Sequence, residues 1–255
     1  SADQSIAVGN YANALALQSS AFGGLSLASA NFSVAVGNNA TATGIAANAF
    51  GNVARATGNQ SLAQGNWANA SGVDATAVGS YVTASNNNSV AIGYSSTSSG
   101  EDAIAIGTGA IAAGNQSISV GYKNNVTGDS AGAFGDPNTV AGTASYAFGN
   151  NNKITAAAPR SVAIGNNNSI TAATSFALGN NNSIATANTF VIGTSTTATL
   201  ADSVSLGNGA QMASGTAATY TAGTGTVNSA TVGDLAYNGF AGATPVGVVS
   251  VGAKG

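Results

Sequence analysis

The chain has 255 residues and a net charge of −3 at pH 7, with 5% charged and 44% hydrophobic side chains. So little positive charge provides no basic surface, and we expect no nucleic-acid partner. Histidine and cysteine are absent, which removes the usual general base, the thiol nucleophile and most transition-metal ligands, so we expect no enzyme, no cofactor and no metal site.

One glycine recurs at a fixed spacing from the start of the chain to about residue 207. Its fifteen copies, which we call the marker glycines, are 14 residues apart except for one step of 16. A period this short predicts a β-solenoid, in which each coil buries its apolar side only by stacking on its neighbours. The marker glycines are Gly9, Gly23, Gly37, Gly51, Gly65, Gly79, Gly93, Gly107, Gly121, Gly135, Gly149, Gly165, Gly179, Gly193 and Gly207.

A first short strand precedes each marker glycine. We number the positions of each coil from its marker glycine. Positions −3 and −1 are mostly large and apolar, as in Val90 and Ile92, whereas position −2 is alanine in twelve of the fifteen coils. Side chains two residues apart lie on one face of a strand, so we predict that positions −3 and −1 form the interior of the coil. The alanine column then faces outward, and its small apolar side chains predict close contact with another copy of the chain.

A second short strand follows each marker glycine. Position +5 is small or apolar and is predicted to be buried, whereas position +4 is mostly polar and is predicted to face solvent. The marker glycine makes one corner, where a positive φ or a tight bend is needed, and a second glycine at +7, as in Gly44 and Gly58, makes the other. The two extra residues of the long step fall near 156–160, at the second corner, where they are expected to bulge outward.

Residues 208–255 lose the period. We therefore divide the chain into a repetitive domain at 1–207, with about fifteen repeats, and a non-repetitive, β-rich segment at 208–255. No apolar stretch approaches the roughly 18 residues that span a bilayer, so we expect no membrane contact by this part of the protein.

One repeat carries a family resemblance. Residues 88–95 read N-S-V-A-I-G-Y-S, and 161–165 are a second close copy. These repeats resemble N-S-V-A-I-G-x-S in the YadA-like heads of the trimeric autotransporter adhesins. The resemblance implies a left-handed parallel β-roll of three identical chains on the surface of a Gram-negative bacterium, with 208–255 leading toward a neck and stalk. It also implies attachment to the outer membrane by a segment absent from this chain.

The resemblance implies a non-catalytic adhesin head that contributes to virulence. Its expected partners are extracellular-matrix proteins such as collagen or fibronectin, host cells and abiotic surfaces, and autoagglutination or biofilm formation is a further expectation. One alternative is an ice- or surface-binding β-solenoid, although Arg55 and Lys153 interrupt the ladder of small polar residues that such a protein needs. A second alternative is a purely structural spacer of a fibre.

Five residues are candidates for ligand contact. Trp67, Tyr81 and Tyr94 follow the marker glycine in three successive coils, and exposed aromatic residues anchor protein or glycan ligands. Asn88 and Ser95 complete the set, because the motif that the family associates with collagen binding leaves them free of a structural role. The alternative for the aromatic residues is that they cover the turn or fill a seam between chains.

Asparagine runs follow the marker glycine in three successive coils, at 150–152, 166–168 and 180–182. Their amides can stack in register from coil to coil. This pattern predicts a structural amide ladder along the corner, with a polar docking strip as the alternative.

Overall fold

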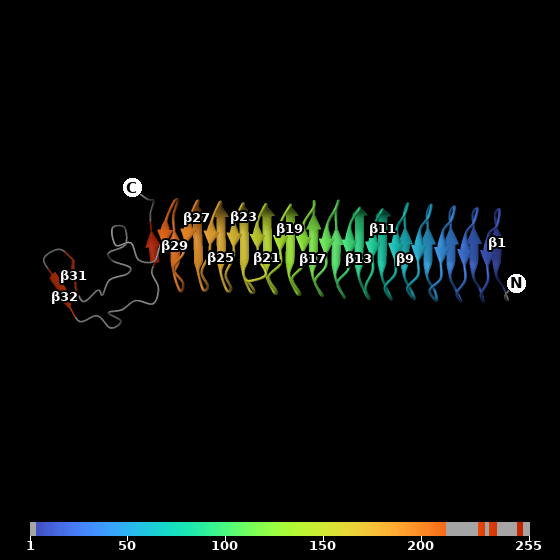
Figure 1. Cartoon of the computed structure of the whole chain (residues 1–255), viewed down its shortest axis with the longest axis horizontal. Coiled ribbons are helices and arrows are strands. Elements are labelled where there is room, and N and C mark those ends of the chain that lie inside the picture. Colours follow the sequence, from blue (N-terminus) through green and yellow to red (C-terminus); the bar gives the residue numbers. More distant parts are fainter. Residues whose placement is uncertain (1–3, 213–228, 233–234, 239–248, 252–255) are drawn as a thin grey trace.

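The computed structural model describes residues 4–212, 229–232, 235–238 and 249–251, and every regular element in these ranges is a β-strand. The coils stack into a straight rod with the N-terminus at one end (Figure 1). Two parallel sheets run along the rod, and each coil contributes one strand to each sheet. The structure therefore confirms the predicted all-β parallel solenoid with coils of about 14 residues.

The first sheet has 16 strands. In their spatial order they are β1 (Ile6–Val8), β3 (Ser20–Phe22), β5 (Val34–Val36), β7 (Asn48–Phe50), β9 (Leu62–Gln64), β11 (Thr76–Ser80), β13 (Val90–Tyr94), β15 (Ile104–Ile106), β17 (Ile118–Gly121), β19 (Gly132–Asp136), β21 (Tyr146–Asn150), β23 (Val162–Asn166), β25 (Phe176–Asn180), β27 (Phe190–Thr194), β29 (Val204–Leu206) and β33 (Val249–Val251).

The second sheet has 15 strands of two residues each. They are β2 (Asn13–Ala14), β4 (Leu27–Ala28), β6 (Thr41–Ala42), β8 (Arg55–Ala56), β10 (Asn69–Ala70), β12 (Thr83–Ala84), β14 (Thr97–Ser98), β16 (Ile111–Ala112), β18 (Asn125–Val126), β20 (Thr139–Val140), β22 (Lys153–Ile154), β24 (Ser169–Ile170), β26 (Ser183–Ile184), β28 (Thr197–Ala198) and β30 (Gln211–Met212).

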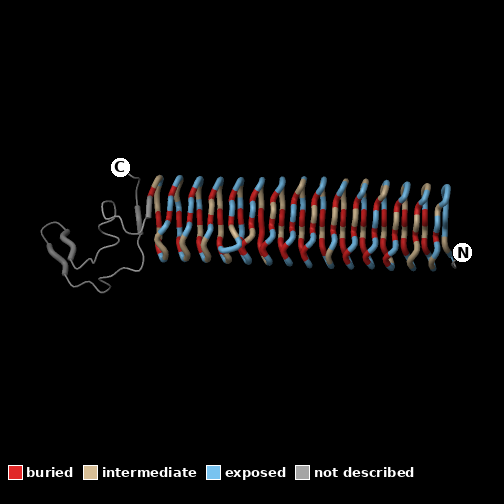
Figure 2. Tube along the Cα trace, viewed as in Figure 1, coloured by how far each residue is buried: buried red, intermediate tan, exposed pale blue. Residues whose placement is uncertain are grey.

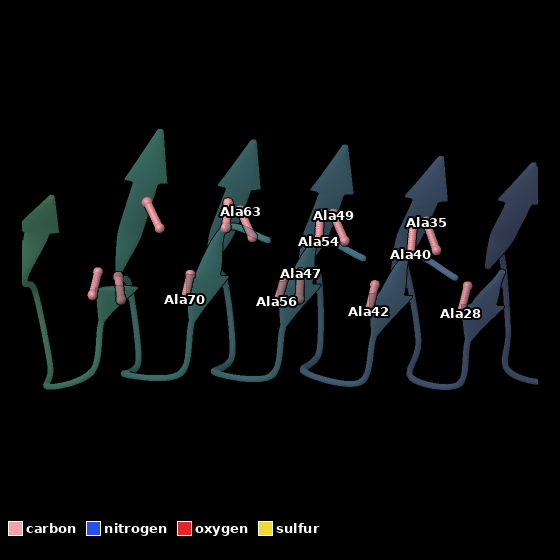
Figure 3. Close-up of a cluster of buried hydrophobic side chains, with 14 of the residues drawn as sticks. Ala28, Ala35, Ala40, Ala42, Ala47, Ala49, Ala54, Ala56, Ala63 and Ala70 are labelled. Carbon is pink, nitrogen blue, oxygen red and sulfur yellow. The ribbon is translucent and has the colours of Figure 1, made fainter. Parts of the chain in front are cut away.

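The side of the first strand that faces the core is the opposite of the one predicted. Ala91, at position −2, is fully buried, as are all the alanines of this column from Ala21 onward. They point into the space between the two sheets (Figure 3). The large residues at −3 and −1 point outward instead, and Ile92 keeps 37% of its surface exposed. A 14-residue coil encloses too little space for large side chains on both walls, so the small residues lie inside.

Predictions for the second strand are confirmed. Position +5 is buried throughout the described coils, as Ala42 and Ile170 illustrate, and position +4 is partly or fully exposed. The core changes character along the rod. Its N-terminal part is built almost entirely of alanine, whereas from β18 to β26 position +5 carries valine or isoleucine. The alternation of buried and exposed residues within each coil is visible in Figure 2.

Both predicted glycine corners are present, for two different reasons. Fourteen of the fifteen marker glycines have a φ between +112° and +136°, which L-residues rarely adopt. A Cβ at Gly93 would also lie 2.5 Å from the carbonyl oxygen of Gly107 in the next coil. Gly44 and the other +7 glycines have no positive φ, but a Cβ there would overlap the backbone of the following coil.

Each corner also contains a left-handed residue that the sequence does not reveal. These residues stand at +2 and −5, and most are not glycine, as Tyr81 (φ 59°) and Asn88 (φ 54°) show.

The two extra residues bulge outward, as predicted. Ala156 and Ala157 are exposed in the corner between β22 and β23, while Ala158 is buried. Strand pairing resumes on the far side, where Tyr146 is opposite Val162 across the step of 16.

The described parts of 208–255 include a short antiparallel pair, β31 (Ser229–Val232) with β32 (Leu235–Asn238), and β33, which pairs in parallel with β29. Residues 213–228, 233–234, 239–248 and 252–255 lie outside the described residues, so the role of this segment as a transition toward a neck stays a prediction. No helix in the described part of the chain is long and apolar enough to cross a membrane.

Candidate functional site

The outward side chains at −3 and −1 form a continuous surface along the first sheet, which we call the apolar stripe. Ile92, Ile106, Phe148, Leu178 and Ile192 in this stripe each keep 37–39% of their surface exposed. Contiguous exposed apolar surface on a soluble protein marks an interaction site. The stripe runs the length of the rod because the repeat places the same two positions on the same face in every coil.

Aromatic residues concentrate in the C-terminal half of the apolar stripe. The rings of Phe134 and Phe148 stack with a centroid distance of 5.0 Å and an interplanar angle of 4°. Phe176 and Phe190 stack in the same way at 4.8 Å. The N-terminal half has two phenylalanines in separate coils, Phe22 and Phe50, and is otherwise aliphatic with polar interruptions at Ser20, Asn48, Gln64 and Thr76.

The corner after the first strand carries four of the five ligand-contact candidates. Trp67, Tyr81 and Tyr94 are 50–54% exposed, and the rings of Tyr81 and Tyr94 meet edge to face at 6.0 Å. Ser95 is exposed in the same corner, in a left-handed conformation. The structure therefore brings these four residues together on one edge of the rod, and their role as ligand contacts stays a prediction.

Asn88, the fifth candidate, lies apart from the other four. It precedes β13, whereas Tyr94 ends that strand, so the two residues stand at opposite corners of one coil. Its side-chain amide donates a hydrogen bond to Asp102 Oδ1 at 2.8 Å in the next coil. This partner gives Asn88 a structural role that the sequence does not show.

The predicted amide ladder is present and is longer than expected. Asn152, Asn168 and Asn182 are buried at position +3, and each donates from Nδ2 to Oδ1 of the asparagine one coil before, at 2.9–3.0 Å. Asn124 and Asn138 extend the ladder toward the N-terminus. Because these five amides lie inside the coil, they cannot serve as a docking strip. Their shared +3 position was the signal that could have identified the two additional members.

Among the described residues, no group of three or more His, Cys, Asp or Glu side chains is placed to hold a metal ion. Asp74, Asp102 and Asp202 are exposed turn residues at position −5, as their place in the repeat predicts.

The geometry defines the class of protein: a rod-shaped β-solenoid that presents one apolar face, one polar face and two repetitive corners. The family model of the YadA head domain repeat (two copies) matches residues 1–26, 14–40, 56–81 and 84–110. These matches support a YadA-like head of a trimeric autotransporter adhesin. A comparison with curated proteins found no match to this sequence.

The family match has a general functional implication. The family is one of structural adhesins, and the match suggests an adhesin-type function for the chain. Members are exposed on the cell surface and anchored in the outer membrane.

Proposed function

We propose that this chain is the head of a bacterial surface adhesin that works as a homotrimer and attaches to extracellular-matrix proteins, host cells or abiotic surfaces. The observation that carries the proposal is the apolar stripe on a rod of the YadA head family. Collagen and fibronectin are the first matrix proteins to test, and autoagglutination and biofilm formation are the corresponding cell-level activities.

Self-association is the simplest way to cover the apolar stripe. The stripe is repetitive and as long as the rod, and another copy of the chain supplies a matching surface of the same length and spacing. The assembly is thus proposed to use the large side chains at −3 and −1, rather than the alanine column, which is fully occupied in the core. Apolar contacts of this kind dominate obligate interfaces.

Attachment then falls to the surfaces that the assembly leaves free. The corner with Trp67, Tyr81 and Tyr94 offers large, partly rigid side chains that suit ligand contact. Three chains and many heads on one cell multiply such contacts, so weak single contacts give strong overall attachment. Broad, multivalent adhesion therefore fits this surface better than a single deep pocket.

The test combines a mass measurement in solution with binding of the purified chain to a panel of matrix proteins, glycans and plastics. We expect a mass three times that of the 24.2 kDa chain, and attachment to at least one member of the panel. The triple variant Trp67→Ser, Tyr81→Ser, Tyr94→Ser is expected to lose most of this attachment while remaining trimeric.

Tyr11→Ser is the matched control. Tyr11 stands at the same kind of corner and is 74% exposed, but it lies in the first described coil, away from the three aromatic residues. Unchanged attachment by the triple variant would remove the aromatic corner from the proposal. A monomeric chain would overturn the assembly.

A further inference from the structure

A repetitive surface can pair with its own copy at several axial offsets. Adjacent coils are about 4.8 Å apart, and a shift of one coil brings similar side chains together again over much of the apolar stripe. Val90 and Ile92 are followed by Ile104 and Ile106, which present nearly the same surface. A unique assembly therefore needs at least one feature of the stripe that does not repeat.

We propose that Gly132, Phe134, Tyr146 and Phe148, on β19 and β21, fix the axial register between copies of this chain. We call these four residues the aromatic step. The inference rests on the self-association proposed above and assigns the choice of register to particular side chains.

The aromatic step is the sharpest change of side-chain size along position −3. Gly132 has no side chain, and a Cβ there would lie 2.7 Å from Cδ1 and 3.0 Å from Cε1 of Tyr146. The tyrosine ring of one coil therefore occupies the space over the glycine of the coil before it, and Gly132 is buried beneath the ring. Phe134 and Phe148 stack beside this pair at position −1. Position −3 therefore has no side chain in one coil and a tyrosine ring in the next, whereas position −1 is phenylalanine in both.

The other irregularities of the stripe discriminate less. Phe176 and Phe190 stand at −3 in two successive coils, so a shift of one coil still places one phenylalanine level against the other. Ser20, Asn48 and Thr76 alternate with aliphatic residues at position −3, and this pattern tolerates a shift of two coils. Phe22 and Phe50 at position −1 are also two coils apart, so the same shift places one against the other.

Only an in-register assembly places each level of the aromatic step against the same level of the other copies. A shift by one coil in one direction places Tyr146 of one chain opposite Gly132 of its neighbour. A shift in the other direction places Tyr146 opposite Val162. Close-packed interfaces tolerate neither the overlap nor the void that results.

The absence of cysteine from the chain allows a direct test. One batch carries Val90→Cys and a second carries Ile104→Cys, and the two are unfolded, mixed, refolded together and oxidised. Disulfides need Cα atoms about 4.4–6.8 Å apart, so a bond between two like-numbered cysteines reports the in-register assembly and a mixed bond reports a shift by one coil. Ile92→Cys and Ile106→Cys repeat the measurement for position −1.

With the native aromatic step, we expect like-numbered disulfides to exceed mixed ones by on the order of tenfold, which corresponds to a modest preference in free energy. In a background of Gly132→Val, Phe134→Val, Tyr146→Val and Phe148→Ile, this ratio should fall to about twofold or less. The control background, Ile118→Val with Val120→Ile, changes the neighbouring strand without a step in size and should keep the native ratio. Circular dichroism checks that each background retains its β-structure.

The outcomes separate the two proposals. If the variant with all four residues of the aromatic step replaced is trimeric and still forms only like-numbered disulfides, the role of the aromatic step is overturned. The proposed self-association is then unaffected. A monomeric mass, or no disulfide in either column, overturns the self-association through the apolar stripe on which the inference rests. If the fourfold variant loses its β-structure, Tyr146→Val alone tests the role in a folded chain: the ratio is expected to fall, and an unchanged ratio overturns the role of the aromatic step.

Discussion

At the scale of single residues, this fold reverses the usual placement of small and large apolar side chains. Alanine and serine fill most of the core, with valine and isoleucine at position +5 of the later coils, and the larger side chains of the first strand cover one outer face. The cause is the short coil, whose two walls stand too close for large residues to interdigitate. Stability then depends on residues that permit close stacking, chiefly glycines at the corners and small or amide side chains inside.

Replacing a marker glycine tests this close stacking. Gly93→Ala should destabilise the chain by about 3 kcal/mol, because alanine is strained at a strongly positive φ and its Cβ meets the next coil's carbonyl oxygen. Urea unfolding followed by circular dichroism measures the loss. The control is Gly209→Asn, where φ is +63° and a Cβ meets nothing within 4 Å. Asparagine tolerates that conformation, so a large loss at Gly209 or none at Gly93 would contradict the explanation.

The buried amide ladder supports a second prediction at this scale. Asn152 donates to the carbonyl oxygen of Gly165 at 2.7 Å, and its Oδ1 accepts from Asn168. Asn152→Ala leaves buried backbone groups without partners and should cost about 2–4 kcal/mol. Asn151→Gly, at the exposed left-handed neighbour, should change stability by less than about 0.5 kcal/mol. Urea unfolding measures both variants. Equal losses of unfolding free energy at the two positions would contradict a stabilising role of the buried amide ladder.

The sequence predicted some residue-level features and missed others for physical reasons. The repeat period, the corner glycines and the burial of position +5 can be predicted from the regular spacing of residues alone. None of these three predictions depends on the width of the coil. The orientation of the first strand does depend on coil width, and residue size alone led to the wrong face. The separation of Asn88 from Tyr94 also escaped prediction, because eight adjacent letters of a motif span both corners of the coil.

At the scale of elements, the coil is the unit, and its corners tolerate change that its strands do not. Strand pairs keep their register across the step of 16 because the extra residues leave the coil as a bulge. Each coil contacts mainly its two neighbours, so local changes at a corner stay local.

Deleting Ala156 and Ala157 tests this tolerance. Both residues are exposed, and the deletion restores the spacing of 14 that the other coils use. We expect an unchanged circular dichroism spectrum and a loss of stability below about 1 kcal/mol. Deleting Val162 and Ala163 instead removes two paired residues of β23 and should abolish cooperative folding of the C-terminal coils. The corner explanation fails if the two deletions behave alike in thermal unfolding.

At the scale of the whole molecule, the narrow core and the apolar stripe are two consequences of one cause. A coil with room for large residues on only one inner wall places the large apolar residues of the first strand outside, and an exposed apolar face of that kind marks an interaction site. The fold class could be inferred from the repeat. The expectation of a partner rested on the alanine column, which lies in the core, and self-association stays a proposal that now rests on the large outward residues. The surface that meets the partner could not be inferred from the repeat, because it depends on which wall of the coil is the inner one.

Placing charge on the stripe tests the assembly as a whole. Ile92→Lys with Ile106→Lys puts two charges on half-exposed positions of successive coils, and we expect the solution mass to fall from that of a trimer to 24.2 kDa with the β-structure retained. The proposed interface buries these positions, and a buried unpaired charge is strongly unfavourable. Thr83→Lys with Thr97→Lys adds the same charge to the polar face of β12 and β14 and should leave the trimer intact. If the polar-face pair dissociates the assembly and the stripe pair does not, the copies meet through the second sheet.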